Sequence, residues 1–204
     1  MTEAVIFDMD GTILDTEAVY EAGWISAGVD RELYYQFIGR PLKRINEMLL
    51  DAGLDPDKTR EKKEAYTENA LKDGIPLKPG AEYLLGSLKE AGLKLAVATS
   101  STIERAYEYL QRAGLDGYFD KITSGHLLER GKPAPDIFLI AAKELGAAPE
   151  NCFVVEDSYS GVRAGKAAGM QVIMVPDRVA PDEEIRALAD YVLPDLNGAV
   201  EIIL

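Results

Sequence analysis

The stretch VIFDMDGTILD, residues 5–15, decides the fold, because an apolar run ends there in two carboxylates and a glycine. The run before the first aspartate is typical of a buried strand, and Gly11 allows the backbone to turn away after it. Asp8 and Asp10 stand two residues apart, so their side chains share a face of an extended backbone. The pattern predicts a strand that delivers the carboxylate of Asp8 to a sheet edge, with Asp10 close by.

Apolar strand-like runs alternate with helical periodicity along most of the chain, which is typical of a parallel α/β sheet. Helices are expected to begin near residues 80, 102, 135 and 159. The predicted fold class is therefore α/β, with a doubly wound, Rossmann-like parallel sheet. Its strands are expected at residues 3–8, 93–99, 119–123, 152–157, 171–175 and 191–193.

Residues 16–78 break this alternation, because they read as several amphipathic helices and contain no strand-like run. Helical signals cover residues 30–37, 41–52 and 57–72, with glycines as helix stops. We therefore expect two domains. A core is formed by residues 1–15 and 79–204, and residues 16–78 form an inserted helical domain.

Thr99, Ser100 and Ser101 follow the second predicted strand, directly before a helix that begins near Thr102. Hydroxyl groups and backbone N–H groups at a helix N-terminus can bind phosphoryl oxygens. Taken alone, an N-cap explains such a segment better, and Ser101 is suited either to that role or to a substrate contact. The segment is thus a candidate anion site or a helix start.

Lys132 stands in the proline-rich loop GKPAPD, residues 131–136, which precedes another predicted helix. Prolines fix the backbone, which helps when one cation must point at a fixed place. Asp136 either orients this loop or caps the following helix, and we favour the cap.

Glu156 and Asp157 end the fourth predicted strand, where carboxylates in apolar surroundings are costly unless a cation or hydrogen bonds compensate them. Hard oxygen ligands of this kind favour Mg²⁺. Just beyond, Gly161, Gly165 and Gly169 recur every four residues, and this spacing favours close packing of one helix face.

These four polar segments resemble, in the same order, the four motifs of the haloacid dehalogenase-like superfamily. The resemblance covers nearly the whole chain and implies Mg²⁺-dependent phosphoryl transfer through an aspartyl phosphate. It makes Asp8 the nucleophile and Asp10 the acid/base. Thr99 would bind the phosphoryl group, with Ser100 and Ser101 beside it, and Lys132 would pair with the nucleophile and the phosphoryl group.

The same resemblance implies a metal site made of Asp8, the backbone carbonyl of Asp10, and Asp157 and Glu156. For Glu156 a hydrogen-bonding role behind the metal is the alternative to direct ligation. The inserted helices resemble a cap that covers the active site and selects the substrate. Arg40 could place its charge over the far end of the substrate, although a solvated helix charge explains it as well.

Within the superfamily, the segments DMDGTILDTE, KPAPDIF and VVEDSYSGV resemble small-sugar phosphatases and β-phosphoglucomutase. We therefore expect hydrolysis of a small phosphorylated metabolite, such as a sugar or polyol phosphate. A phosphomutase is the alternative, but Tyr20 and Ile103 stand where the mutase has a histidine and an asparagine. A phosphosugar-binding module without catalysis is disfavoured, because it could dispense with Asp10.

Composition and charge limit the classes of binding partner that the chain is expected to have. The net charge of −13 would repel a nucleic-acid backbone, and no Lys/Arg block offsets it. There is no leader-like N-terminus and no apolar stretch long enough to cross a bilayer, so a cytoplasmic protein without a membrane partner is expected. Cys152 has no second cysteine to pair with and begins an apolar run, which indicates a core position.

Overall fold

The strand that precedes Asp8, β1 (Ala4–Phe7), is an inner strand of a parallel sheet. The computed structural model describes residues 1–38, 40 and 42–204, and over these residues the sheet has six strands in the order β3-β2-β1-β4-β5-β6. The predicted α/β fold with a parallel sheet is confirmed, and each predicted strand is present within about two residues of its expected ends. The remaining strands are β2 (Lys94–Thr99), β3 (Lys121–Ser124), β4 (Cys152–Glu156), β5 (Gln171–Met174) and β6 (Tyr191–Val192).

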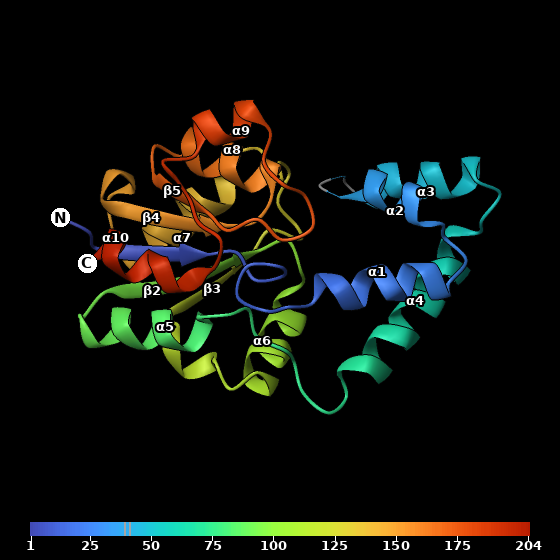
Figure 1. Cartoon of the computed structure of the whole chain (residues 1–204), viewed down its shortest axis with the longest axis horizontal. Helices are drawn as coiled ribbons and strands as arrows, with labels where there is room; N and C mark the ends of the chain where they lie inside the picture. Colours follow the sequence, from blue (N-terminus) through green and yellow to red (C-terminus); the bar gives the residue numbers. More distant parts are fainter. Residues whose placement is uncertain (39, 41) are drawn as a thin grey trace. The chain divides into compact units, whose positions relative to one another are not determined.

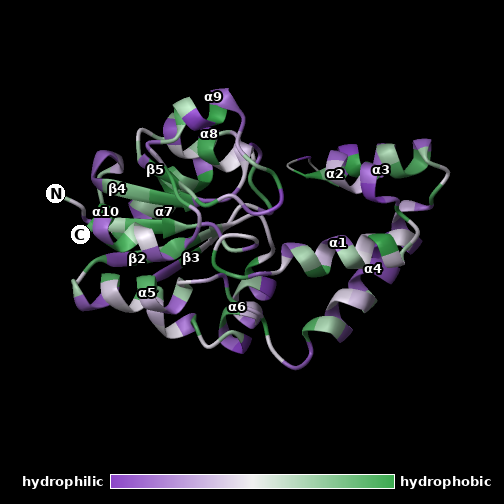
Figure 2. Ribbon diagram, in the orientation of Figure 1, coloured by the Kyte–Doolittle hydropathy of each residue, from purple (hydrophilic) through white to green (hydrophobic). Residues whose placement is uncertain are grey.

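Helices cover both faces of this sheet (Figure 1). On one face, α7 (Asp136–Leu145), α8 (Tyr159–Ala167) and α9 (Glu183–Leu188) pack against alternate residues of the strands. On the other face, α5 (Ala81–Glu90) and α10 (Ala199–Ile203) lie together. Figure 2 shows β4 and β5 as hydrophobic, as expected for strands that helices cover on both sides.

The helix after β2 is α6 (Ile103–Arg112), which packs beside β3. Three short 3₁₀ segments complete this part of the chain, at Asp116–Tyr118, Pro149–Asn151 and Leu196–Gly198. No helix in the described ranges is both long and apolar enough to cross a membrane.

The chain divides into two compact units, the first made of Met1–Asp15 with Pro76–Leu204 and the second of Thr16–Ile75. The predicted core began at residue 79, three residues later than in the structure. Backbone hydrogen bonds explain the difference, because Asp15 N donates to Pro76 O at 2.8 Å and Lys78 N donates to Ile13 O at 3.0 Å. These bonds join the segment before α5 to the segment after β1.

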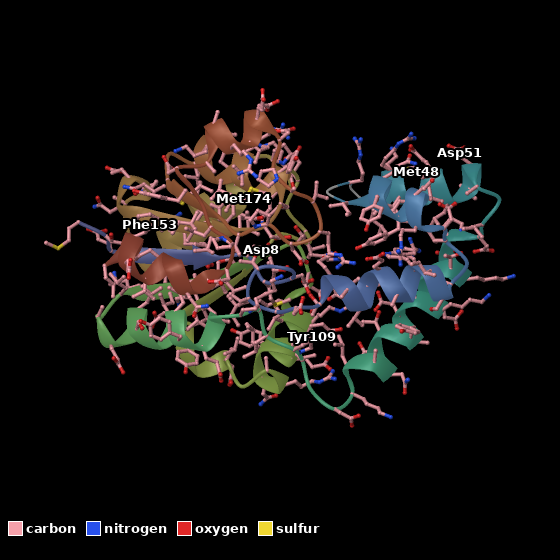
Figure 3. All side chains as sticks on the ribbon, in the orientation of Figure 1. Asp8, Met48, Asp51, Tyr109, Phe153 and Met174 are labelled. Atoms are coloured by element: carbon pink, nitrogen blue, oxygen red, sulfur yellow. The ribbon has the colours of Figure 1, made fainter. Side chains whose placement is uncertain are left out.

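The second unit is helical, as its sequence predicts. It contains α1 (Glu17–Ser26), α2 (Arg31–Phe37), α3 (Leu42–Asp51) and α4 (Pro56–Leu71), and the predicted first residue of α3, Pro41, lies outside the described residues. Trp24 packs edge-on against Phe37 with ring centroids 5.3 Å apart. On α3, Met48 belongs to the core of this unit, whereas Asp51 is exposed (Figure 3).

Candidate active site

The predicted site residues of the first unit gather where the sheet changes direction, whereas Arg40 belongs to the second unit. From β1 the chain moves to β2 and β3 on one side, and it then returns to β4 and β5 on the other side of β1. In open parallel sheets, ligands bind outside the carboxyl ends of the strands at this switch point. The carboxyl ends of β1, β2 and β4 carry Asp8, Thr99 and Glu156 respectively.

Asp8 follows the last residue of β1 (Figure 3), and its N–H still donates to Val155 O of β4, at 3.0 Å. The residue is 9% exposed. Burial raises the pKa of Asp8 from 3.8 to about 7, the Lys132 ammonium opposes that increase, and the neighbouring carboxylates of Glu156 and Asp10 add to it. A carboxylate with a perturbed pKa at a switch point is a typical functional group.

Lys132 lies against Asp8 although 124 residues separate the two in the chain. Its Nζ donates to Asp8 Oδ1 at 2.5 Å, to Glu156 Oε1 at 2.7 Å and to the Ala98 carbonyl at 3.2 Å. Burial alone would lower the pKa of Lys132, but the two carboxylates outweigh it and hold that pKa above its usual value. The side chain is only 7% exposed, so a fixed positive charge stands beside Asp8.

Glu156 is 1% exposed, and both of its carboxylate oxygens accept hydrogen bonds. Oε1 accepts from Lys132, while Oε2 accepts from Asp157 N, Ser158 N and Ser158 Oγ, each at 2.9 Å. These contacts compensate the buried charge without a metal. They therefore favour the hydrogen-bonding role of Glu156 over direct ligation.

Asp10 lies in the turn that follows β1. Gly11 has a φ of 83°, which favours glycine, and the N–H groups of Ile13 and Leu14 both donate to Met9 O. The turn brings Asp10 to Ser101, whose hydroxyl donates to Asp10 Oδ2 at 3.1 Å. Sequence reasoning missed this contact, because 91 residues separate the two groups.

The segment after β2 differs in one respect from the prediction. The N-cap of α6 is Thr102, whose hydroxyl accepts from Arg105 N at 3.3 Å, so Ser101 does not take the first of its two predicted roles, the N-cap. Thr99 is 1% exposed and its Oγ1 accepts from Ser101 N at 3.1 Å, which leaves its hydroxyl hydrogen for an anion. Ser100 is exposed.

The predicted cap role of Asp136 was also wrong. Asp136 is the first residue of α7, and its Oδ1 accepts from Nε and Nη2 of Arg130, at 3.1 and 2.9 Å. This ion pair joins the two ends of the loop that carries Lys132. Asp136 thus orients the loop, which is the alternative role that its sequence position allows.

Asp157 follows β4 and is partly exposed. Its Oδ1 accepts from the hydroxyl of Thr12, which is fully buried, at 3.0 Å. In the part of the chain that the structure describes, no group of three or more His, Cys, Asp and Glu side chains could hold a metal ion. Two carboxylates with a backbone carbonyl remain, and Mg²⁺ is commonly held by so few protein ligands together with substrate phosphate and water.

A buried carboxylate, a fixed ammonium and a second, hydrogen-bonded carboxylate at the switch point of a parallel sheet are typical of an enzyme active site. The comparisons with known proteins agree. Residues 2–169 match the family model described as haloacid dehalogenase-like hydrolase, and the chain belongs to that family.

Its relatives include phosphatases. The chain is 36% identical over 185 residues to a phosphorylated carbohydrates phosphatase of Thermotoga maritima, and the match covers 84% of this chain and 83% of the relative. A crystal structure of CbbY from Rhodobacter sphaeroides in complex with xylulose-(1,5)bisphosphate matches with a TM-score of 0.82 and 30% identity, covering 97% of this chain and 96% of that one. The β-phosphoglucomutase of Clostridium difficile matches with a TM-score of 0.80 and 27% identity, covering 97% and 93%.

Proposed function

We propose that this chain is a Mg²⁺-dependent phosphatase that hydrolyses a small phosphorylated carbohydrate through an aspartyl-phosphate intermediate. The observation that carries the proposal is the contact of Lys132 Nζ with Asp8 Oδ1 at 2.5 Å inside a buried site, with Asp10 on the following turn. The names of the relatives support a carbohydrate phosphate as substrate.

In the first half-reaction, an oxygen of Asp8 forms a bond to phosphorus, and the bond from phosphorus to the leaving oxygen breaks. Asp10 gives its proton to that departing oxygen, and the Ser101 hydroxyl keeps the Asp10 carboxyl in place. Lys132 pairs with the charge on the phosphoryl oxygens as it redistributes. Thr99 donates its hydroxyl hydrogen to one of these oxygens.

In the second half-reaction, Asp10 takes a proton from water as the water oxygen attacks phosphorus, and the bond to Asp8 breaks. Asp8, Asp157 and the backbone carbonyl of Asp10 would hold Mg²⁺, since they are hard oxygen donors at one end of the sheet. The bound ion supplies charge neutralisation between phosphate and carboxylates. Glu156 accepts a hydrogen bond from Lys132 and so positions it, and Thr12 positions Asp157 by donating a hydrogen bond to it.

We propose that Arg40 in the helical unit helps to select the substrate. Within that unit a cavity of about 280 Å³ is lined by Tyr35, Gln36, Ile38, Arg40, Arg44 and Met48. Two guanidinium groups beside apolar side chains suit a polar, anionic molecule. Arg40→Ala is expected to raise KM for the physiological substrate and to leave an aryl phosphate almost unaffected; equal changes in both would contradict this role.

Two residues, Tyr20 and Ile103, favour hydrolysis over transfer of the phosphoryl group to a second sugar hydroxyl. Tyr20 lies on α1 with its ring 4.2 Å from Lys63 Nζ, and Ile103 begins α6. Tyr20 thus packs within the helical unit, and Ile103 has no polar group to offer a sugar.

The proposal is tested by measuring phosphate release from a panel of sugar and polyol phosphates with Mg²⁺. β-Glucose 1-phosphate with glucose 1,6-bisphosphate is run alongside and assayed for glucose 6-phosphate. We expect phosphate release from one or a few members, and loss of that release with EDTA. Glucose 6-phosphate formed without phosphate release would show a mutase instead, and no turnover of any member would contradict the proposed function.

A further inference from the structure

Gly161 touches the buried carboxylate that holds Lys132. It is the third residue of α8, and a Cβ built on it would lie 1.7 Å from Glu156 Oε1, 1.8 Å from its Cδ and 2.3 Å from Oε2. The φ of Gly161 is not positive, so its backbone conformation does not require glycine. The close approach of the Glu156 carboxylate does, because no side chain fits between the two.

The glycines of the four-residue repeat therefore have different roles. Gly165, one turn further along α8, faces apolar side chains, and a Cβ there would lie 2.8 Å from Val172 Cγ2 and 3.3 Å from Val154. Helix packing, which the sequence predicts for all three glycines, describes Gly165. Gly161 instead makes room for a charged group.

Ser158 joins the start of α8 to the same carboxylate. Its hydroxyl accepts from Gly161 N at 3.1 Å and donates to Glu156 Oε2 at 2.9 Å. The N-cap of the helix therefore also fixes Glu156. Displacing the carboxylate would disturb both the helix start and the Lys132 contact.

We propose that Gly161 is a positioning residue for Lys132, which it places through Glu156; this rests on the proposed role of Lys132 in phosphoryl transfer. Lys132 Nζ has two charged acceptors, Asp8 and Glu156, and a flexible stem whose position they determine. An alanine at position 161 pushes the Glu156 carboxylate away from its place. The ammonium then loses one of its two anions, and its position beside Asp8 is no longer fixed.

Gly161→Ala and Gly165→Ala form a matched pair, because they add the same methyl group to the same helix. With 4-nitrophenyl phosphate, Gly161→Ala should lower kcat by about 100-fold, since a catalytic group displaced by an ångström costs a factor of this order. KM should change little. Gly165→Ala should lower the Tm and leave kcat within a factor of about three of the parent.

Repeating Gly161→Ala in a Glu156→Ala variant distinguishes the effect of the Gly161–Glu156 contact from a general effect of the substitution on folding. In the parent, Gly161→Ala should lower the Tm because of the clash. In Glu156→Ala the same change should raise the Tm, because the clash is gone and alanine favours a helix over glycine. It should also cause no further loss of kcat there.

Acylation of lysines with acetic anhydride, read by mass spectrometry of peptides, reports on Lys132 without any turnover. Lys132 should be protected in the parent and in Gly165→Ala, and should be modified in Gly161→Ala. Unchanged protection in Gly161→Ala, or a Tm change of the same sign in both backgrounds, would overturn the proposal. A parent without phosphatase activity would instead contradict the proposed function, and the protection and Tm results would still decide whether Gly161 positions Lys132.

Discussion

Lys132→Met tests the charge balance of the site most sharply, because methionine keeps much of the volume and removes the charge. In the parent, Nζ lies 2.5 Å from Asp8 Oδ1 and 2.7 Å from Glu156 Oε1, and Glu156 is 1% exposed. Removing one partner of a buried ion pair costs about 3–5 kcal/mol in the free energy of unfolding. We expect about 3 kcal/mol, the lower end of that range, since Glu156 Oε2 keeps three hydrogen bonds.

The effect on catalysis should be separate from the effect on stability. Loss of one preorganised group that stabilises transition-state charge lowers the rate by about 10²–10³, or about 3–4 kcal/mol. The free energy of unfolding is measured by urea denaturation, and kcat/KM is measured on an aryl phosphate below the midpoint of thermal unfolding. Lys132→Met should lower both quantities.

The double variant Lys132→Met with Glu156→Gln provides the control. Neutralising Glu156 removes one of the two buried carboxylate charges that lose Lys132, so we expect part of the lost stability to return while kcat/KM stays low. A kcat/KM of Lys132→Met within about threefold of the parent would refute the reasoning. A double variant that is less stable than Lys132→Met would also refute the reasoning.

Three further predictions concern neighbouring groups. Thr12→Val should raise the Mg²⁺ concentration for half-maximal activity about tenfold, because Asp157 loses the donor that orients it; the measurement is a Mg²⁺ titration of the rate. Ser101→Ala should lower kcat more for alkyl phosphates than for aryl phosphates, because only poor leaving groups depend on proton donation by Asp10. The raised pKa of Asp8 means that the folded chain keeps a proton that the unfolded chain releases, so stability of the metal-free protein should fall as pH rises from about 4 to about 7. Asp8→Asn should flatten this pH dependence in urea titrations.

The strands and the polar residues at their ends could be predicted from the sequence, because both depend on local patterns. Four apolar residues before Asp8 form β1, and the apolar run 152–155 forms β4 together with Glu156. Parallel pairing then brings the carboxyl ends of these strands to one edge of the sheet. The positions of Asp8 and Glu156 followed from that pattern.

Contacts between distant segments could not be predicted in the same way. The sequence leaves Ser101 open between an N-cap and a substrate contact, whereas its hydroxyl donates to Asp10 and Thr102 caps the helix. The four-residue spacing predicts a packing role for Gly161, because spacing along a helix does not show what the helix faces. Ser158 carried a usable signal, since a serine directly after a strand-end carboxylate pair is suited to cap the next helix.

The central claim is that Asp8 carries the phosphoryl group during turnover. The most direct measurement is a rapid acid quench of the enzyme mixed with its best substrate and Mg²⁺, followed by mass spectrometry of the peptide that contains Asp8. We predict the added mass of one phosphoryl group on Asp8, and neither this adduct nor phosphate release in Asp8→Asn. Phosphate release by Asp8→Asn at the parental rate, with no adduct on the parent's Asp8, would contradict the account.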